Sequence, residues 1–227
     1  MSKTGTEPAK RGRPRRGPDP ERFAEIVEAA AAVILEKGYS ATSIQDIADR
    51  IGILKGSLYH YVRSKEDFLY KIIKDVYDEA IADMRSVTEA ERAPLEQLAA
   101  FVRAHVLFAA KHLVAYTIQL REFDRLSEAR RAEIREGGDT YVVVLQRILE
   151  EGQREGVIDG AIDPRLASIM ITGELNSMTR WYRPDGAKSA EQLADVYSGM
   201  IVSSVASEAA VSSAGGIEVL RAAFVQA

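Results

Sequence analysis

The 227-residue sequence contains no cysteine, only seven prolines and no long apolar run. Without cysteine there are no disulfides, no Cys-based zinc sites and no thiol nucleophile. The absence of any run of about eighteen apolar residues argues against a transmembrane helix. The basic N-terminus also lacks the apolar segment that follows it in a secretory signal. We therefore expect a cytoplasmic protein with no membrane partner, and the scarcity of proline permits long helices.

The motifs of common catalytic sites are missing as well. The three histidines are His60, His105 and His112. Since His105 and His112 are seven residues apart, they would lie roughly 10 Å apart along one helix, too far to share a metal ion. The chain contains no His-Glu-x-x-His motif, no Gly-x-Ser-x-Gly elbow and no phosphate-binding glycine loop. We predict no enzymatic activity, no metal site and no cofactor.

The formal net charge of −4 conceals an uneven distribution along the chain. Residues 1–65 hold 12 Lys and Arg against 8 Asp and Glu, whereas the remainder holds 18 against 26. Residues 1–16 alone hold six basic residues and a single acidic one, Glu7. A basic end on an acidic body favours contact with a polyanion such as DNA. A flexible solubilising tail is the alternative explanation.

Apolar residues recur at helical spacing along nearly the whole chain after residue 18, and no segment alternates as a strand does. Capping residues, N-terminal prolines and glycines mark the helix ends. The expected starts are Pro20, the Thr42-x-x-Gln45 capping box, Lys55, Ser64, Pro94, Tyr141, Asp163-Pro164 and the Ser189-x-x-Gln192 capping box. The expected stops and breaks are Gly38, Gly52, Lys111, Gly137-Gly138, Gly156, Tyr182 and residues 212–216. The sequence predicts an all-α fold of about nine helices.

Two short helices meet at Gly52 behind a longer first helix, which is the pattern of a helix-turn-helix. In such motifs the second helix lies in the major groove of DNA. Leu58 and Val62 are expected to face inward and anchor this helix. The residues expected to face outward are Lys55, Ser57, Tyr59 and His60, with Gly56 allowing a close approach to DNA.

Residues 38–69, with the sequence GYSATSIQDIADRIGILKGSLYHYVRSKEDFL, resemble the DNA-binding domain of TetR-family (TetR/AcrR-type) regulators. The matching elements are Thr42 at the start of the second helix, Gly52 at the turn, Gly56-Ser57-Leu58-Tyr59 in the recognition helix and Ser64-Lys65-Glu66 at the start of the fourth helix. The resemblance implies a DNA-binding domain, a larger helical sensor domain, and a dimer on a palindromic operator.

The same resemblance assigns roles to individual residues of the DNA-binding domain. Thr42, Tyr59, His60 and Lys65 are expected to contact phosphates, and Lys55, Gly56 and Ser57 to lie nearest the base edges. Tyr61 is expected to pack between helices. Upstream, Arg11-Gly12-Arg13-Pro14 resembles an AT-hook core, so Arg11 and Arg13 are expected to enter the minor groove.

The resemblance also implies a ligand pocket among the C-terminal helices. The expected lining residues are His105, Tyr116, Gln119, Tyr141, Asn176, Arg180 and Trp181, each of which could instead be a satisfied core residue. Residues 176–186 are similar to a segment of family members that regulate lipid or sterol breakdown and respond to acyl-CoA thioesters. Arg180 or Arg183 would then meet a phosphate or carboxylate, with packing at a dimer interface or loop as the alternative.

A two-fold operator requires a two-fold protein, so we expect a homodimer. The last two long helices would form its interface. The expected residues are Ile169, Met170 and Trp181, followed by the small-residue face of Ser198, Gly199, Val202, Ser203, Ala206 and Ala210. Burial of that face inside one subunit is the competing interpretation.

These observations predict four regions: a basic disordered arm (1–18), a helix-turn-helix domain (19–65), a helical ligand-binding and dimerisation domain (66–211) and a C-terminal tail (212–227). The predicted function is a ligand-responsive repressor that binds an operator in double-stranded DNA and is released by a small hydrophobic or acyl-CoA-like effector. The alternatives are a drug-efflux regulator that responds to a drug-like ligand and an effector-independent DNA-architecture protein.

Overall fold

The computed structural model describes residues 19–136 and 141–224. Within these ranges every regular element is a helix, and the only strand-like pairing is an isolated bridge between Ile158 and Ala206. The all-α prediction is therefore confirmed, but the described ranges contain twelve α-helices and one 3₁₀ helix rather than about nine helices. The predicted stop at Lys111 is confirmed. The excess comes from segments for which no separate helix was expected, such as Leu113–Glu122 and Glu128–Arg135.

The N-terminal unit, here called the head, comprises α1 (Pro20–Lys37), α2 (Ile44–Ile51) and α3 (Lys55–Leu58). Gly38 ends α1 at φ +79°, and Gly52 ends α2 in the left-handed conformation at φ +67°. These positive φ angles are accessible to glycine without the steric cost that a Cβ atom would bring. Both predicted glycine stops are confirmed.

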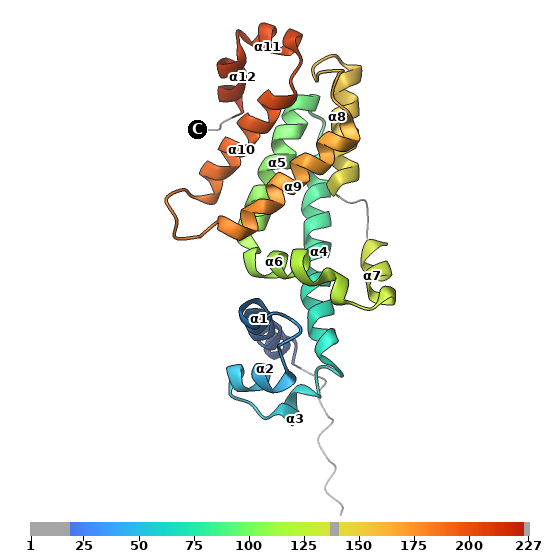
Figure 1. The fold of residues 1–227 in the computed structure, drawn as a ribbon, viewed down its shortest axis with the longest axis vertical. Coiled ribbons are helices and arrows are strands. Elements are labelled where there is room, and N and C mark those ends of the chain that lie inside the picture. The colour runs from blue at the N-terminus through green and yellow to red at the C-terminus, as the bar shows by residue number, and fades with distance from the viewer. Residues whose placement is uncertain (1–18, 137–140, 225–227) are drawn as a thin grey trace, which may run out of the picture.

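Helix α4 (Lys65–Thr88) runs from the head into the second unit, here called the sensor domain (Figure 1). Its first half contributes Phe68 and Ile73 to the core of the head, and its second half contributes Ala80 and Met84 to the core of the sensor domain. The predicted boundary after residue 65 thus falls at the start of a helix shared by both cores, not in a linker.

The sensor domain contains α5 (Pro94–Lys111), α6 (Leu113–Glu122), η1 (Phe123–Arg125), α7 (Glu128–Arg135), α8 (Tyr141–Arg154), α9 (Pro164–Trp181), α10 (Ala190–Val205), α11 (Glu208–Ala214) and α12 (Ile217–Ala223). The predicted start at Pro94 and the predicted caps Asp163 and Ser189 are confirmed. Gly137-Gly138 lies outside the described residues. In the part of the chain described, no single helix is long and apolar enough to cross a membrane.

The C-terminal segment is more ordered than the predicted break at residues 212–216 implies. Residues up to Ala214 belong to α11, and only Gly215 and Gly216, with positive φ angles, form the turn into α12. The buried side chain of Leu220 then packs α12 against the core of the sensor domain. The small residues indicated a break over residues 212–216, but the helix continues to Ala214 and the break is limited to the two glycines.

Candidate DNA-binding surface and effector cavity

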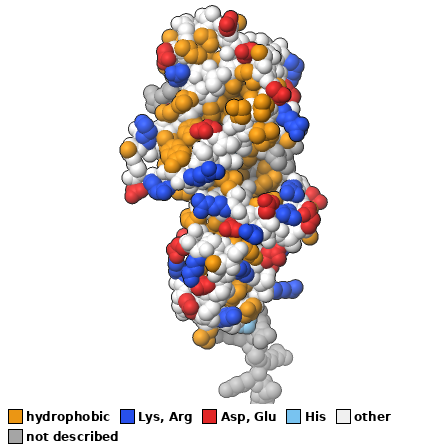
Figure 2. Space-filling model, in the orientation of Figure 1, with side chains coloured by type: hydrophobic (Ala, Val, Ile, Leu, Met, Phe, Trp, Pro, Cys, Tyr) orange, Lys and Arg blue, Asp and Glu red, His pale blue; other side chains and the backbone are white. Residues whose placement is uncertain are grey.

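The turn and α3 present a compact outward face on the head. Leu58 and Val62 are buried, which confirms them as the anchors of this helix. The regular helix ends at Leu58, although the amide of Val62 still donates to the carbonyl of Leu58, so a further turn follows. The residues exposed on this face are Lys55, Gly56, Tyr59 and His60, with Ser57 half-buried. On the face drawn in Figure 2, Lys and Arg side chains lie over the head and its junction with the second unit, interspersed with Asp and Glu.

Leu54 is a residue of this face that the sequence analysis missed. It precedes α3 directly and its side chain is 81% exposed, next to Lys55. An apolar side chain at the entrance of a recognition helix can contact the methyl group of thymine in the major groove. The sequence offered one indication: Leu54 is a large apolar residue that does not fall on the apolar stripe of either neighbouring helix.

The start of α2 corrects the prediction for Thr42. The N-cap is Ser43, whose hydroxyl accepts from the amide of Asp46 at 3.1 Å, while the carboxylate of Asp46 accepts from the amide of Ser43 at 2.7 Å. Thr42 is buried and its hydroxyl donates to the carbonyl of Gly38. The Thr42-x-x-Gln45 pattern overlaps Ser43-x-x-Asp46 by one residue, and a carboxylate makes the stronger bond to an N-cap amide. The exposed hydroxyl at this helix end is therefore that of Ser43.

Lys65 and Tyr61 hold parts of the head together. The ammonium of Lys65 donates to the carbonyls of Tyr39 and Thr42, both at 2.7 Å, and lies over the ring of Tyr39. These bonds tie the loop before α2 to the start of α4 and leave little of Lys65 for a phosphate. Tyr61 stacks on Phe23 with ring centroids 5.7 Å apart, which confirms its packing role. Arg11 and Arg13 lie outside the described residues.

A cavity of about 200 Å³ lies in the sensor domain between α4, α6, α8 and α9. Four of the predicted ligand-contacting residues line it: Tyr116, Gln119, Tyr141 and Asn176. The remaining lining residues are Tyr77, Ala80, Ile81, Leu120, Val142 and Thr172. Arg180 and Trp181 are exposed at the end of α9 and lie outside this cavity. The structure therefore brings together residues from four helices that are far apart in the sequence.

Polar groups around the cavity form one buried network. The hydroxyl of Tyr116 donates to Oδ1 of Asn176 at 2.7 Å and lies 3.3 Å from Nε2 of His105. Since that hydroxyl has a single proton, Nε2 of His105 is assigned as the donor in the second contact, which leaves Nδ1 as an acceptor. Burial lowers the pKa of His105 to about 4 and raises the pKa of Tyr116 and of Tyr141. The network is uncharged near neutral pH.

Two buried polar atoms on the cavity wall have no hydrogen-bond partner: Oε1 of Gln119 and Oγ1 of Thr172. A third is Nδ1 of His105, on the imidazole whose Nε2 contacts Tyr116. Buried polar atoms are rarely left unpaired in folded proteins, and each unpaired group costs about 1–3 kcal/mol. The cavity wall is thus suited to a ligand that is mostly apolar and carries one or two groups able to form hydrogen bonds with these atoms.

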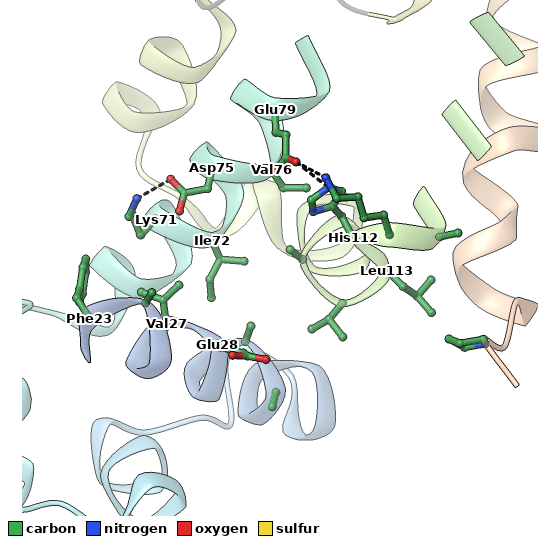
Figure 3. Close-up of a pocket in the computed structure, with 18 of the residues that line it drawn as sticks. Phe23, Val27, Glu28, Lys71, Ile72, Asp75, Val76, Glu79, His112 and Leu113 are labelled. Carbon is green, nitrogen blue, oxygen red and sulfur yellow. Dashed lines mark hydrogen bonds and ion pairs between the residues drawn. The ribbon is translucent and has the colours of Figure 1, made fainter. Parts of the chain in front are cut away.

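A second, open groove of about 840 Å³ lies between α1, α4 and the junction of α5 with α6 (Figure 3). Val27, Ile72 and Leu113 are among the apolar residues that line it. At its rim Lys71 forms an ion pair with Asp75 at 2.7 Å, and Nε2 of His112 lies 3.1 Å from the carboxylate of Glu79. Residues of both units line the groove, and no motif in the sequence predicted it.

An exposed apolar face runs along α9 and α10. The exposed residues are Leu166, Ile169, Met170 and Trp181 on α9, and Val196 and Met200 on α10. Of the predicted interface residues, Ser198, Gly199 and Val202 are instead buried within the subunit, and the hydroxyl of Ser198 bonds to the carbonyl of Ala99 on α5. Small side chains allow α10 to pack closely on α5. These three residues are therefore packed inside the subunit, as the competing interpretation expects.

The rest of the small-residue face is also engaged inside the subunit. Ala206 is partly buried and pairs with Ile158, and Ala210 packs against the core. The half-buried Ser203 bonds to the carbonyl of Met200. Val196 and Met200, which the sequence analysis missed, are the large apolar residues that α10 exposes.

Comparison with known proteins accounts for both units. Residues 26–72 match the profile described as "Bacterial regulatory proteins, tetR family", and residues 91–205 match "Tetracyclin repressor-like, C-terminal domain". The HTH-type transcriptional repressor KstR2 of Mycobacterium tuberculosis is 31% identical over 188 residues, covering 82% of this chain and 94% of KstR2. The fatty acid metabolism regulator protein of Bacillus subtilis is 32% identical over 72% of this chain and 85% of that protein.

Solved structures agree with these matches. The structure of the ketosteroid regulator KstR2 of Mycobacterium tuberculosis superposes with a TM-score of 0.79 at 30% identity, covering 85% of this chain and 98% of KstR2. The structure of AibR in complex with isovaleryl coenzyme A and operator DNA superposes with a TM-score of 0.70 at 30% identity, covering 79% and 97% of the two chains. The chain belongs to the TetR family of bacterial transcriptional regulators.

Proposed function

We propose that this protein is a cytoplasmic repressor that binds a palindromic operator as a dimer and leaves it when a short acyl-CoA-like effector binds. One observation carries the proposal: α4 begins at Lys65, a short segment after the recognition helix, and further along the same helix Tyr77, Ala80 and Ile81 line the effector cavity. A change in the cavity therefore reaches the DNA-binding surface through one continuous element.

The chemistry of the cavity supports the choice of effector. Its volume of about 200 Å³ is smaller than the usual site for a drug-sized ligand, roughly 300–1,000 Å³, and suits a short acyl group. Gln119 and Thr172 offer polar atoms to a thioester or to the neighbouring amide of a pantetheine arm. AibR binds isovaleryl coenzyme A in its structure, and another relative is a fatty acid metabolism regulator.

The exposed face on α9 and α10 supports the dimer. It carries six large apolar side chains in the described part of both helices, including Met170 and Met200. A two-fold axis that buries this face against its copy gives an isologous interface and leaves both heads free to bind successive half-sites.

A drug-sized hydrophobic effector is the second candidate, and the groove of about 840 Å³ favours it. That volume lies within the range of drug-binding pockets, and residues of both the head and the sensor domain line it. A molecule in this groove would contact α1 and α6 simultaneously.

The test begins with a DNA duplex that the protein selects from a random library and that then receives a fluorescent label. Effector candidates are titrated into the complex of protein and labelled duplex, and release of the duplex is measured. We expect isovaleryl-CoA to release the duplex and isovaleric acid or free CoA to be far weaker. Thr172→Val should reduce the sensitivity to the thioester roughly fivefold, the value of one hydrogen bond. Thr179→Val is the matched control, because the hydroxyl of Thr179 bonds within α9 and does not line the cavity. Release by a planar hydrophobic drug but by no thioester would contradict the proposed effector.

A further inference from the structure

Helix α7 belongs to the sensor domain by sequence but packs against the head. Leu126, just before α7, and Ile134, near its end, are almost fully buried in the hydrophobic core formed by α1, α2 and the first half of α4. Figure 1 shows α7 on one side of α4 and α1 on the other. The groove described above lies on the side of α1, so the contact through α7 is a separate tie between the two units.

Polar contacts reinforce this tie at the first turn of α4. The amide of Ser127 donates to the carboxylate of Glu66 at 2.9 Å. The guanidinium of Arg130 donates to Asp67, lies 3.7 Å from Glu66 and covers the ring of Tyr70. About a quarter of each side chain in the Arg130–Asp67 pair is exposed, so solvent screens the pair only in part.

Asp67 connects Arg130 to the end of the recognition segment. While Oδ1 of Asp67 accepts from Arg130, Oδ2 accepts from the amide of Arg63 at 2.7 Å and from the amide of Ser64 at 2.9 Å. Burial alone would raise the pKa of Asp67, but these hydrogen bonds outweigh it and lower the pKa. One ionised carboxylate therefore holds α7 and the backbone that leaves the recognition helix.

The position of α7 in the chain links this contact to the effector cavity. Gln119 and Leu120 line the cavity from α6, which precedes α7, and Tyr141 and Val142 line it from the start of α8, which follows α7. The segment that contains Arg130 therefore connects two walls of the cavity in the sequence, from Leu120 on α6 to Tyr141 on α8.

We propose that Arg130 is a positioning residue that holds the recognition helix in its DNA-binding orientation through Asp67 and transmits effector binding to the head. The inference rests on the proposed function and adds a route through α7 to the route along α4. Arg130 itself acts without touching DNA.

The test compares Arg130→Gln, Arg130→Lys and Arg131→Gln in the full-length protein, with the selected duplex and isovaleryl-CoA as probes. Arg131 is the matched control: it lies on the same helix and bonds to Asp124 and Glu128 of its own segment. We expect Arg130→Gln to weaken operator binding on the order of tenfold and to reduce the ratio of affinities with and without effector. Arg131→Gln should change neither, and Arg130→Lys, which keeps the charge, should be intermediate.

The salt dependence distinguishes positioning from direct contact. Loss of a phosphate contact lowers the slope of log affinity against log salt by about 0.9, whereas loss of a positioning residue leaves that slope unchanged. Two outcomes would overturn the inference in an experiment where the wild-type protein binds its duplex. One is that Arg130→Gln and Arg131→Gln show the same operator affinity and effector response. The other is that Arg130→Gln has a reduced salt slope. If Arg130→Gln did not fold, an Arg130→Lys variant with wild-type affinity and response would overturn it equally. A wild-type protein that selects no duplex would overturn the proposed function as well.

Discussion

Acid should destabilise the fold through His105, which is buried beside Tyr116 and Tyr141. The unfolded chain has an ordinary imidazole pKa of 6.5, whereas burial lowers the pKa to about 4 in the folded protein. Above pH 6.5 the imidazole is neutral in both states, and its contribution to stability is fully present. As the pH falls from 6.5 towards 4, the unfolded chain takes up a proton that the folded chain excludes. The free energy of unfolding therefore decreases in this window.

The magnitude follows from the gap between the two pKa values. From 6.5 to about 4, at 1.36 kcal/mol per pH unit, the loss reaches about 3 kcal/mol near pH 4. Urea unfolding of the wild type and His105→Gln between about pH 4 and pH 7 measures it, because the contribution of the carboxylates is common to both proteins and cancels in the difference. The amide of Gln retains a donor for Tyr116. Parallel stability curves for the two proteins would show that the folded imidazole titrates normally and would refute the reasoning.

Three further predictions concern the head and the dimer face. Leu54→Ala should weaken operator binding several-fold by removing one apolar base contact, and selection of duplexes by the variant should show relaxed preference at one position per half-site. Ser43→Ala should lower the free energy of unfolding by about 1 kcal/mol in thermal denaturation, whereas Gln45→Ala should have little effect. Met200→Lys should convert the dimer to monomers in sedimentation, while Val219→Lys, on an exposed apolar position of α12, should leave the dimer intact.

Local signals in the sequence predicted the helix ends well. Gly38 and Gly52 adopt the positive φ angles that their role as stops requires, and the capping box at Ser189 forms as its spacing indicated. Thr42 and Ser43 show where such signals become ambiguous: both begin a plausible capping pattern, and only the structure shows which hydroxyl meets an amide. Such patterns predict that a helix begins here, but they do not determine which of two adjacent residues is its N-cap.

Contacts between distant segments were beyond local patterns. Tyr116 and Asn176 were recognised as polar residues on apolar helices, but their hydrogen bond joins positions 60 residues apart. Ile134 lies in a strongly polar stretch and is nevertheless buried in the head. The small residues around Ser198 indicated close helix packing, and periodicity cannot tell whether the partner helix is in the same subunit or in another.

The central claim is that effector binding moves the two heads of a dimer relative to each other. Because the chain lacks cysteine, a single Glu25→Cys substitution on α1 allows one spin label to be placed on each head. The measurement is the label-to-label distance in the operator complex and after addition of isovaleryl-CoA. The account predicts one narrow distance on the operator and a different distance with the effector. Release of the operator without any change in that distance would contradict it.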